Sequence, residues 1–289
     1  MLPAIISESA AAVISPGTPA KVESVQTVGG GCINASFRIS VSGMPYFLKW
    51  NHAGKYPGMF EAEEKGLNLL HEAGANVPKV VTAQTAGAYS YLLLEWIEGG
   101  RQQKTFWEDF GKQLALQHQH TAQQPGLDHD NYIGSLRQSN RRHATWTEFF
   151  LAERIEPQAK LAIDSGKAGK ELAGRIAVLS KALPGIIPAG QPSLLHGDLW
   201  NGNFLVDQNG AACLVDPAVY YGHREMDLAM SRLFGGFDHE FYEAYNDVFP
   251  IGKDFDQRVD IHNLYPLLVH VNLFGGGYLR QVESILSRF

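Results

Sequence analysis

The chain has 289 residues, 45% of them hydrophobic and 19% charged, which is the composition of a folded globular protein with a sizeable core. Its formal net charge of −6 disfavours a nucleic-acid partner, and no apolar run reaches the length of a membrane span. The two cysteines, Cys32 and Cys213, cannot form a disulfide framework, and the first basic residue is Lys21, so no signal peptide is indicated. We therefore expect a cytoplasmic protein that binds neither nucleic acid nor membranes.

The first third of the chain combines short β-prone segments with helical ones. A short amphipathic helix and a Pro/Gly turn are expected within the first 20 residues. Strands are expected at 22–28, 36–41, 45–50, 77–83 and 89–96, and a helix is expected at 59–74. The sequence IEGG at 97–100 breaks this pattern and indicates a hinge.

The rest of the chain is mostly helical by pattern. Two capping boxes, Thr105 with Glu108 and Thr145 with Glu148, predict helices over 105–120 and 145–164. Further helices are expected at 168–182, 238–247 and 257–285. The predicted fold class is α+β in two lobes. Residues 1–97 would form a small β-rich N-terminal lobe, and residues 98–289 would form a larger helical lobe that carries the catalytic loop and substrate pocket.

The stretch HGDLWNGNFLVDQNGAACLVD, residues 196–216, interrupts the helices with two apolar runs around an Asn-Gly pair. Asn209-Gly210 is a strong signal for a two-residue hairpin turn. That turn would place Asn203 directly opposite Asp216, with Cβ atoms roughly 5 Å apart. Because amide and carboxylate oxygens suit Mg²⁺, we predict Asn203 and Asp216 as metal ligands.

Asp198 precedes Asn203 in the pattern H-x-D-x-x-x-x-N. In phosphoryl transfer the Asp of this pattern accepts the proton of a substrate hydroxyl, and the Asn binds metal. We therefore predict Asp198 as the catalytic residue. The structural alternative is that Asp198 and Asp216 serve only in turns or caps. It accounts for either residue alone, but not for the whole arrangement.

If the reaction is phosphoryl transfer, the small lobe should supply a lysine for the phosphates and a glutamate that orients it. Lys49 lies within the apolar strand YFLKW, where a lysine is unusual unless it reaches a partner. Glu63 lies on the core-facing side of the helix that follows, so we predict a Lys49–Glu63 pair. Glu61 and Glu64 are the competing choices.

Two further segments fit nucleotide binding by their order in the chain. A glycine-rich loop ahead of Lys49 would offer backbone N–H groups to the β- or γ-phosphate, and its predicted contributors are Gly30, Gly31, Cys32 and Asn34. The hinge would offer backbone groups near Glu95 and Ile97 to adenine. A simple turn and a plain linker are the structural alternatives. No A-P-E element follows the HGD…N…D residues, which favours a small-molecule kinase over a protein kinase.

These residues together resemble the fructosamine (ketosamine) 3-kinase family, within the aminoglycoside and choline phosphotransferase group. The resemblance covers most of the chain and rests on GGGCINASF, LLHGDLWNGN, DPAVYYGHREMDLAM, FGGF and LVHVNLFGGGY. Asn201 stands where the family often has serine. The resemblance implies a bilobal protein-kinase-like fold. It also implies ATP- and Mg²⁺-dependent phosphorylation of the 3-hydroxyl of a ketosamine, such as a fructosamine or ribulosamine, free or attached to a protein lysine. Loss of the 3-phosphate would then reverse glycation.

Several residues are expected near the substrate. By position or family likeness they are Trp200, Tyr220, Tyr221, His223, Arg224, Glu225, His270 and Asn272. A core position is the structural alternative for Trp200, and it is the more usual role for a histidine on an apolar helix. Asp227 is expected instead to hydrogen-bond the backbone of the catalytic loop, as in other kinase-like folds.

Cys32 lies in the glycine-rich loop, where neighbouring N–H groups would favour its thiolate and its oxidation. Similar family members carry a cysteine there that is linked with redox control and disulfide-bridged dimers. A monomer and a redox-sensitive homodimer are therefore both open. The structural alternative for Cys32 is a small, tolerated loop residue.

Two other functions stay open. One is a kinase for another small alcohol of the aminoglycoside, choline or thiamine type, whose cationic substrate calls for more acidic residues in the pocket. The other is a nucleotide-binding regulator without turnover, which would bind ATP without consuming it.

Overall fold

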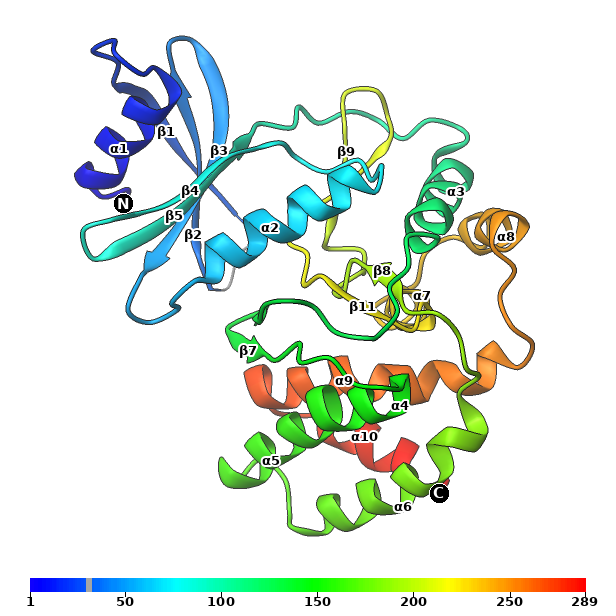
Figure 1. The fold of residues 1–289 in the computed structure, drawn as a ribbon. Helices are drawn as coiled ribbons and strands as arrows, with labels where there is room; N and C mark the ends of the chain where they lie inside the picture. The colour runs from blue at the N-terminus through cyan, green and yellow to red at the C-terminus, as the bar shows by residue number, and fades with distance from the viewer. Residues whose placement is uncertain (30–32) are drawn as a thin grey trace. The chain divides into compact units, whose positions relative to one another are not determined.

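The structure is a computed structural model of the whole chain, and residues 1–29 and 33–289 are described in it. The chain forms two compact units (Figure 1). Unit 1 comprises Met1–Phe106 and Phe204–Asp216, and unit 2 comprises Trp107–Asn203 and Pro217–Phe289. The hairpin at 204–216 thus groups with the β-rich unit, whereas the sequence assigned all of 98–289 to the helical lobe. Among the described residues, no helix combines the length and apolarity needed to cross a bilayer.

Unit 1 is built on a five-stranded antiparallel sheet. Its strands in chain order are β1 (Val22–Val28), β2 (Ala35–Val41), β3 (Met44–His52), β4 (Val80–Ala86) and β5 (Tyr89–Glu95). They lie side by side in the order β1-β2-β3-β5-β4, which puts β3 in the centre. The predicted strands are all present, with ends that differ by up to three residues.

Two helices cover opposite faces of this sheet, α1 (Ala4–Ile14) and α2 (Met59–Glu72) (Figure 1). The face under α1 holds one core cluster, in which Ile6 packs with Phe37 and Leu48. Because side chains alternate along a strand, Lys49 points to the other face, toward α2. The alternation of β3 therefore decides that this lysine meets the second helix.

The hairpin of unit 1 pairs β9 (Phe204–Val206) with β10 (Ala212–Leu214). Its register differs from the predicted one by one residue, since Phe204 pairs with Leu214 and Val206 with Ala212. The loop is longer than two residues. The Gly210 N–H donates to the Asp207 carbonyl at 2.8 Å, and Gly210 has a φ of 76°. A turn of this kind, closed by a left-handed glycine, makes a three-residue loop. The prediction that the ladder sets Asn203 opposite Asp216 was therefore wrong.

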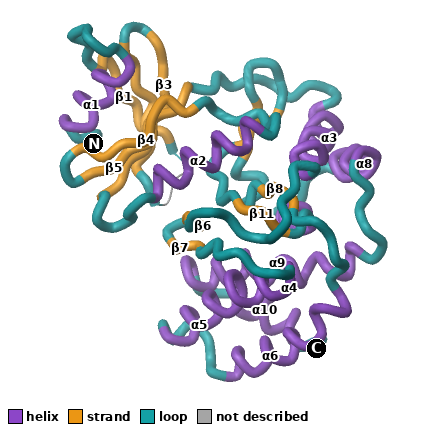
Figure 2. The backbone as a smooth tube through the Cα atoms, in the orientation of Figure 1, coloured by secondary structure: helices purple, strands orange, loops and turns teal. Residues whose placement is uncertain are grey.

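Unit 2 is mostly helical (Figure 2). Its longer helices are α3 (Phe106–His118, whose first residue belongs to unit 1), α6 (Glu171–Ile186), α8 (His239–Val248) and α9 (Phe255–Phe274). The segment predicted as one helix over 145–164 consists of α4 (Trp146–Phe149), a π-helical turn η1 (Phe150–Ile155) and α5 (Glu156–Asp164). The predicted capping box of Thr145 and Glu148 is confirmed. The helix predicted over 257–285 is divided into α9 and α10 (Tyr278–Leu286).

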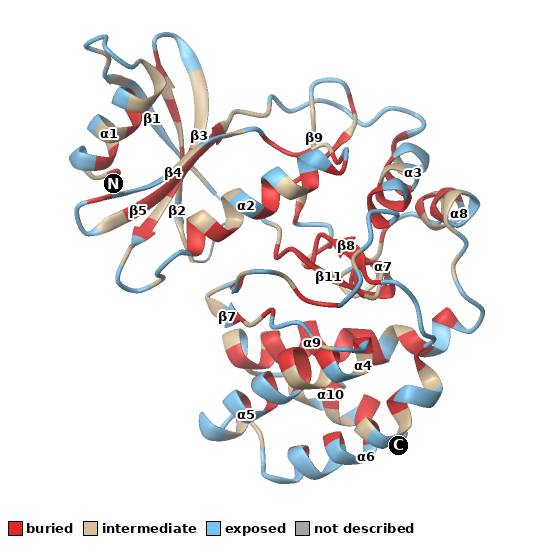
Figure 3. Ribbon diagram, in the orientation of Figure 1, coloured by how far each residue is buried: buried red, intermediate tan, exposed pale blue. Residues whose placement is uncertain are grey.

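Four short strands and one short helix of unit 2 were not predicted. The strands form two antiparallel pairs, β6 (Asn131–Ile133) with β7 (Leu136–Gln138), and β8 (Ser193–Leu195) with β11 (Tyr220–Gly222). The helix is α7 (Glu225–Met230). Helix α9 runs through the core of this unit and is buried along most of its length (Figure 3). Its buried residues include polar ones such as Arg258, His262 and Asn263 as well as apolar ones, so apolar and polar residues do not separate onto two faces and the sequence shows little helical periodicity.

Candidate active site

A buried ionic cluster lies on the α2 face of the sheet in unit 1. The Lys49 Nζ is 2.6 Å from Glu63 Oε1 and 2.5 Å from Asp216 Oδ1. Burial alone would lower the pKa of the Lys49 ammonium, but the Asp216 and Glu63 carboxylates outweigh it and the pKa is raised. The lysine therefore stays charged. The structure confirms the predicted Lys49–Glu63 pair and adds Asp216 to it.

Asp216 lies two residues after the end of β10 and has an unusual backbone conformation. Its φ is 53°, in the left-handed region that residues other than glycine seldom adopt. Its side chain is 59% exposed although one oxygen contacts Lys49. A strained backbone that presents a half-exposed carboxylate is typical of functional sites.

The loop predicted to be catalytic, residues 196–203 of unit 2, is held by side-chain hydrogen bonds. The Asn203 Nδ2 donates to the Asp198 carbonyl at 2.8 Å and to the Asp198 Oδ2 at 2.9 Å. The pair of residues that the H-x-D-x-x-x-x-N spacing predicted is thus in direct contact. Among the described residues both of these bonds use the Asn203 nitrogen, and no hydrogen bond involves its Oδ1.

Asp227 also holds this loop, through hydrogen bonds to its backbone. Its carboxylate accepts the N–H groups of His196 at 2.7 Å and of Gly197 at 2.9 Å, and it contacts His118 Nε2 at 3.2 Å. Gly197 has a φ of 83°, and a Cβ there would lie 2.1 Å from the Ala218 carbonyl. The expected role of Asp227 is confirmed, and Gly197 is required for the close approach of the loop.

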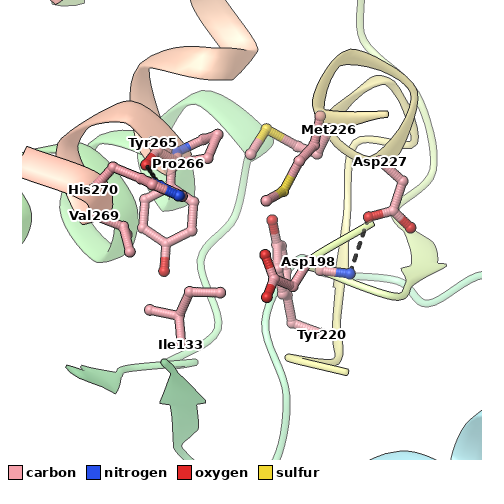
Figure 4. A pocket seen from close by; sticks show the side chains of 11 residues that line it. Ile133, Asp198, Tyr220, Met226, Asp227, Tyr265, Pro266, Val269 and His270 are labelled. Carbon is pink, nitrogen blue, oxygen red and sulfur yellow. Dashed lines mark hydrogen bonds between the residues drawn. The ribbon is translucent and has the colours of Figure 1, made fainter. Parts of the chain in front are cut away.

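A pocket opens beside Asp198 (Figure 4). It lies entirely within unit 2, and its walls come from the catalytic loop, β6, β11, α7 and α9. The lining residues are Ile133, Gly197, Asp198, Tyr220, Met226, Asp227, Met230, Tyr265, Pro266, Val269 and His270. Of the two carboxylates in this wall, Asp227 is buried and bonded to the loop backbone, and Asp198 is held by Asn203. The rest of the wall is aromatic or apolar, apart from His270 and the phenol groups.

Of the residues predicted near the substrate, His270 lines this pocket with Asp198. Its Nδ1 donates to the Pro266 carbonyl at 2.7 Å, and burial lowers the pKa of its imidazole. Trp200, two residues after Asp198 in the loop, packs edge-on against Phe234 at 5.8 Å between ring centroids. Tyr221 lies on β11.

His223 and Glu225 lie in a buried cluster instead of on the pocket wall. Both Glu225 oxygens are bound by Arg258, at 2.8 Å and 2.6 Å, and one also meets His262 Nε2 at 3.1 Å. Two histidines and a carboxylate are also a possible metal-ligand set. Because Arg258 already neutralises the carboxylate, an ion-pair role fits this cluster better.

Asn272 is also buried, and its Nδ2 donates to the carbonyl and side-chain oxygens of Gln158 at 2.9 Å and 2.8 Å. These contacts tie α9 to α5. The structure thus gives Asn272 a helix-packing contact away from the pocket lining.

The residues predicted to bind nucleotide lie in unit 1. Gly30, Gly31 and Cys32 lie outside the described residues. The Asn34 Oδ1 accepts a hydrogen bond from Asn51 Nδ2 at 3.0 Å. At the end of β5, Glu95 accepts the N–H of Lys79 at 2.9 Å, and Ile97 is half-buried in the segment that follows.

Sequence reasoning missed most of the pocket wall. Met226, Met230, Tyr265 and Ile133 read as ordinary core residues, and they come from elements far apart in the chain. Tyr220 was expected near the cleft as part of the family-like run DPAVYYGHRE, and the structure places it in the pocket wall.

By fold and site the protein is a phosphotransferase of the kinase-like class. One unit carries a Lys–Glu–Asp ionic cluster on a β-sheet, with Lys49 buried and Asp216 exposed, and the other carries the Asp198–Asn203 loop beside a pocket. Comparison with known proteins identifies the family. The model of the fructosamine kinase family matches residues 5–289. The chain belongs to this family.

Relatives and solved structures agree. A protein named probable ketoamine kinase from Enterococcus faecium is 42% identical over 91% of this chain and 94% of its own. The chloroplastic protein-ribulosamine 3-kinase of Arabidopsis thaliana is 35% identical, over 96% of this chain and 86% of its own. A crystal structure from Thermobifida fusca, described as a candidate fructosamine-3-kinase, superposes with a TM-score of 0.86 at 34% identity, over 97% and 98%.

A more distant match supports the fold alone. The aminoglycoside phosphotransferase APH(4)-Ia, as a thermostable mutant, has a TM-score of 0.60 at 14% identity, over 93% of this chain and 95% of that one. The predicted kinase-like α+β fold is confirmed.

Proposed function

We propose that this protein transfers the γ-phosphate of ATP to the 3-hydroxyl of a ketosamine, a fructosamine or ribulosamine. The observation that carries the proposal is the Asp198 carboxylate, which lines a pocket and is fixed by Asn203 at 2.9 Å. Family membership supplies the substrate class, since relatives are named ketoamine and protein-ribulosamine 3-kinases.

The chemistry follows from what each side chain can do. The Asp198 carboxylate accepts the proton of the 3-hydroxyl, and the hydroxyl oxygen then forms a bond to the γ-phosphorus. The bond between that phosphorus and the β–γ bridging oxygen breaks, and ADP leaves. Lys49, kept charged by Glu63 and Asp216, offsets negative charge on the nucleotide phosphates.

The residues present fit a magnesium ion. The Asn203 amide oxygen and the Asp216 carboxylate are hard oxygen donors of the kind that Mg²⁺ prefers, and within residues 1–29 and 33–289 the side-chain hydrogen bonds of Asn203 use its nitrogen. When bound, the ion would neutralise charge on the phosphate oxygens. We assign Asn203 and Asp216 to hold it, and we assign the backbone near Glu95 and Ile97 to adenine.

The biological role that goes with this reaction is repair of glycated amines. Spontaneous elimination of the 3-phosphate, followed by hydrolysis of the remaining carbon–nitrogen bond by water, would release the free amine and leave the sugar carbons as a dicarbonyl compound. The acceptor is then either a free ketosamine or one attached to a protein lysine.

The test is an ATP-consumption assay with ribulose-lysine and fructose-lysine, run beside choline and an aminoglycoside. We expect turnover with the ketosamines, and in Asp198→Asn a fall in kcat of about a thousandfold with nucleotide affinity retained. Consumption only with choline or the aminoglycoside would assign the enzyme to a different alcohol. Nucleotide binding without consumption by wild type would point to the non-catalytic regulator.

A further inference from the structure

We propose that the Tyr220 hydroxyl binds a second hydroxyl of the acceptor, beside the one that Asp198 deprotonates. The inference rests on the proposed function and adds to it a residue that recognises a polyol. It starts from the position of the phenol. Tyr220 is fully buried in β11, yet its ring lines the same pocket as Asp198.

Among the described residues no hydrogen bond of ordinary geometry reaches the Tyr220 hydroxyl, and its one polar interaction on the protein side is a weak one with the Arg154 guanidinium. A buried polar group without a partner is costly, and native proteins seldom keep one unless a ligand or water completes it. Figure 4 shows the hydroxyl end of Tyr220 directed into the pocket, between Tyr265 and Met226, with the Asp198 carboxylate next to its ring. A ligand in the pocket would supply this hydroxyl with a partner of good geometry.

The ring cannot easily turn away from this position. Phe149 stacks on it at 5.6 Å between centroids, and the Arg154 guanidinium lies over it at 4.0 Å from the ring centre. The Tyr220 backbone is paired with Leu195 of β8. A hydroxyl held this firmly is pre-organised for one geometry of ligand.

The protonation state of Tyr220 suits it to donate. Burial raises the pKa of the Tyr220 phenol to about 12, although the Arg154 charge acts in the opposite direction. The phenol therefore keeps its proton, while the cation over the ring polarises the O–H bond. An ionised Asp198 can only accept hydrogen bonds, so the two groups form a complementary acceptor and donor in one pocket.

A second tyrosine in the pocket wall provides a contrast. The Tyr265 hydroxyl donates to Gln138 Oε1 at 2.5 Å. The Gln138 Nε2 in turn donates to Asn131 Oδ1 at 2.8 Å and to the Ala218 carbonyl at 3.2 Å. The Tyr265 hydroxyl is thus committed to a protein network, which leaves Tyr220 as the phenol available to a ligand.

This arrangement favours an acceptor with neighbouring hydroxyls. One hydroxyl of the acceptor donates a hydrogen bond to Asp198, and a neighbouring hydroxyl accepts a hydrogen bond from Tyr220. Ile133, Met226 and Val269 then face the C–H groups of the sugar. An alcohol with a single hydroxyl has nothing for Tyr220 to bind. The residue would therefore separate polyols from simple alcohols.

The test uses Tyr220→Phe, with Tyr265→Phe as the matched control. We expect Tyr220→Phe to raise the KM for the ketosamine about tenfold and to leave the KM for ATP unchanged. Its Tm without substrate should equal or exceed that of wild type, because the change removes an unsatisfied buried hydroxyl. Tyr265→Phe breaks a satisfied hydrogen bond and should lower the Tm.

A set of deoxy-ketosamines, each lacking one hydroxyl other than that at carbon 3, completes a double-mutant cycle. With one of these compounds, the KM of wild type should rise about as much as the KM of Tyr220→Phe rises with the full substrate. With the same compound, the KM of Tyr220→Phe should rise no further. A ketosamine KM within twofold of wild type in Tyr220→Phe, or additive losses with every deoxy compound, would overturn the inference alone. If wild type consumes no ATP with any ketosamine, the proposed function fails, and the role given to Tyr220 fails with it.

Discussion

At the scale of single residues, the three glutamates of α2 show how backbone geometry selects one of several similar side chains. Glu61, Glu63 and Glu64 are neighbours in sequence. The face of α2 that packs on the sheet brings Glu63 to 2.6 Å from Lys49. The helical periodicity that made Glu63 the predicted choice is thus what the structure uses.

The Lys49–Glu63 ion pair should affect how tightly the enzyme binds ATP. Glu63→Gln keeps the shape of the side chain but removes the negative charge that orients the Lys49 ammonium. We expect the KM for ATP to rise roughly tenfold, because a lysine held by Asp216 alone is less well placed for the phosphates. The KM for the ketosamine should not change, and steady-state kinetics with each substrate varied in turn separates the two.

Glu61→Gln and Glu64→Gln are the matched controls, since they remove the same charge from the same helix. Both should leave the KM for ATP within twofold of wild type. If all three variants raise the KM for ATP equally, the effect reflects the net charge of the helix and not the contact between Glu63 and Lys49.

At the scale of elements, the β9–β10 hairpin marks where sequence reasoning stopped being sufficient. Asn209-Gly210 correctly placed a turn, but the same dipeptide fits both a two-residue and a three-residue loop. The Asp207 carboxylate decides between them, since it accepts the N–H groups of Asn209 at 2.8 Å and Ala211 at 3.0 Å. An Asx turn of this kind competes with the tighter turn and shifts the register by one residue.

The π-helical turn η1 is a second element that the sequence did not predict. Its wider turn carries Glu153 and Arg154, two consecutive charged residues that are both buried, which an ordinary helix at a core surface seldom allows. Glu153 is bound by Arg141 and His143. Arg154 has hydrogen-bond acceptors and aromatic rings around it.

We predict that Arg154→Gln destabilises unit 2. The guanidinium donates to the Ser139 carbonyl and to Asn140 Oδ1, each at 2.6 Å, and the shorter glutamine cannot reach both. The free energy of unfolding should fall by about 2 kcal/mol, the cost of leaving buried acceptors without a charged donor. Urea denaturation measures it. Arg137→Gln, on the exposed side of β7, is the control and should unfold within about 0.5 kcal/mol of wild type.

At the scale of the whole molecule, the residues of the site that could be predicted are those whose proximity follows from short sequence motifs. Asp198 with Asn203, and Lys49 with Glu63, each follow from a local spacing on one loop, strand or helix. The pocket wall does not, because Ile133, Tyr220 and Tyr265 meet only through the tertiary packing of β6, β11 and α9. Their apolar neighbours look the same in sequence whether they face a pocket or a closed core.

The buried cluster around Glu225 should make the stability of the folded chain sensitive to acid. The His223 Nδ1 lies 4.0 Å from Glu225 Oε2, and its ring stacks on His262 at 5.3 Å. Burial, with a smaller effect from His262, lowers the pKa of His223 to about 3, against an ordinary value of 6.5. Between these values the unfolded chain binds a proton that the folded chain does not, so stability falls as the pH falls from 6.5 toward 3.

We therefore predict that His223→Gln flattens the loss of stability in acid. Over that window His223 contributes a slope of up to about 1.4 kcal/mol per pH unit, which the variant lacks. Urea denaturation of wild type and variant at pH 7.5 and pH 5.0 measures the difference, and titrations elsewhere in the molecule cancel in the comparison. His239→Gln, at an exposed position on α8, should follow wild type at both pH values. If His223→Gln loses as much stability as wild type between the two pH values, His223 is not the group that takes up the proton on unfolding.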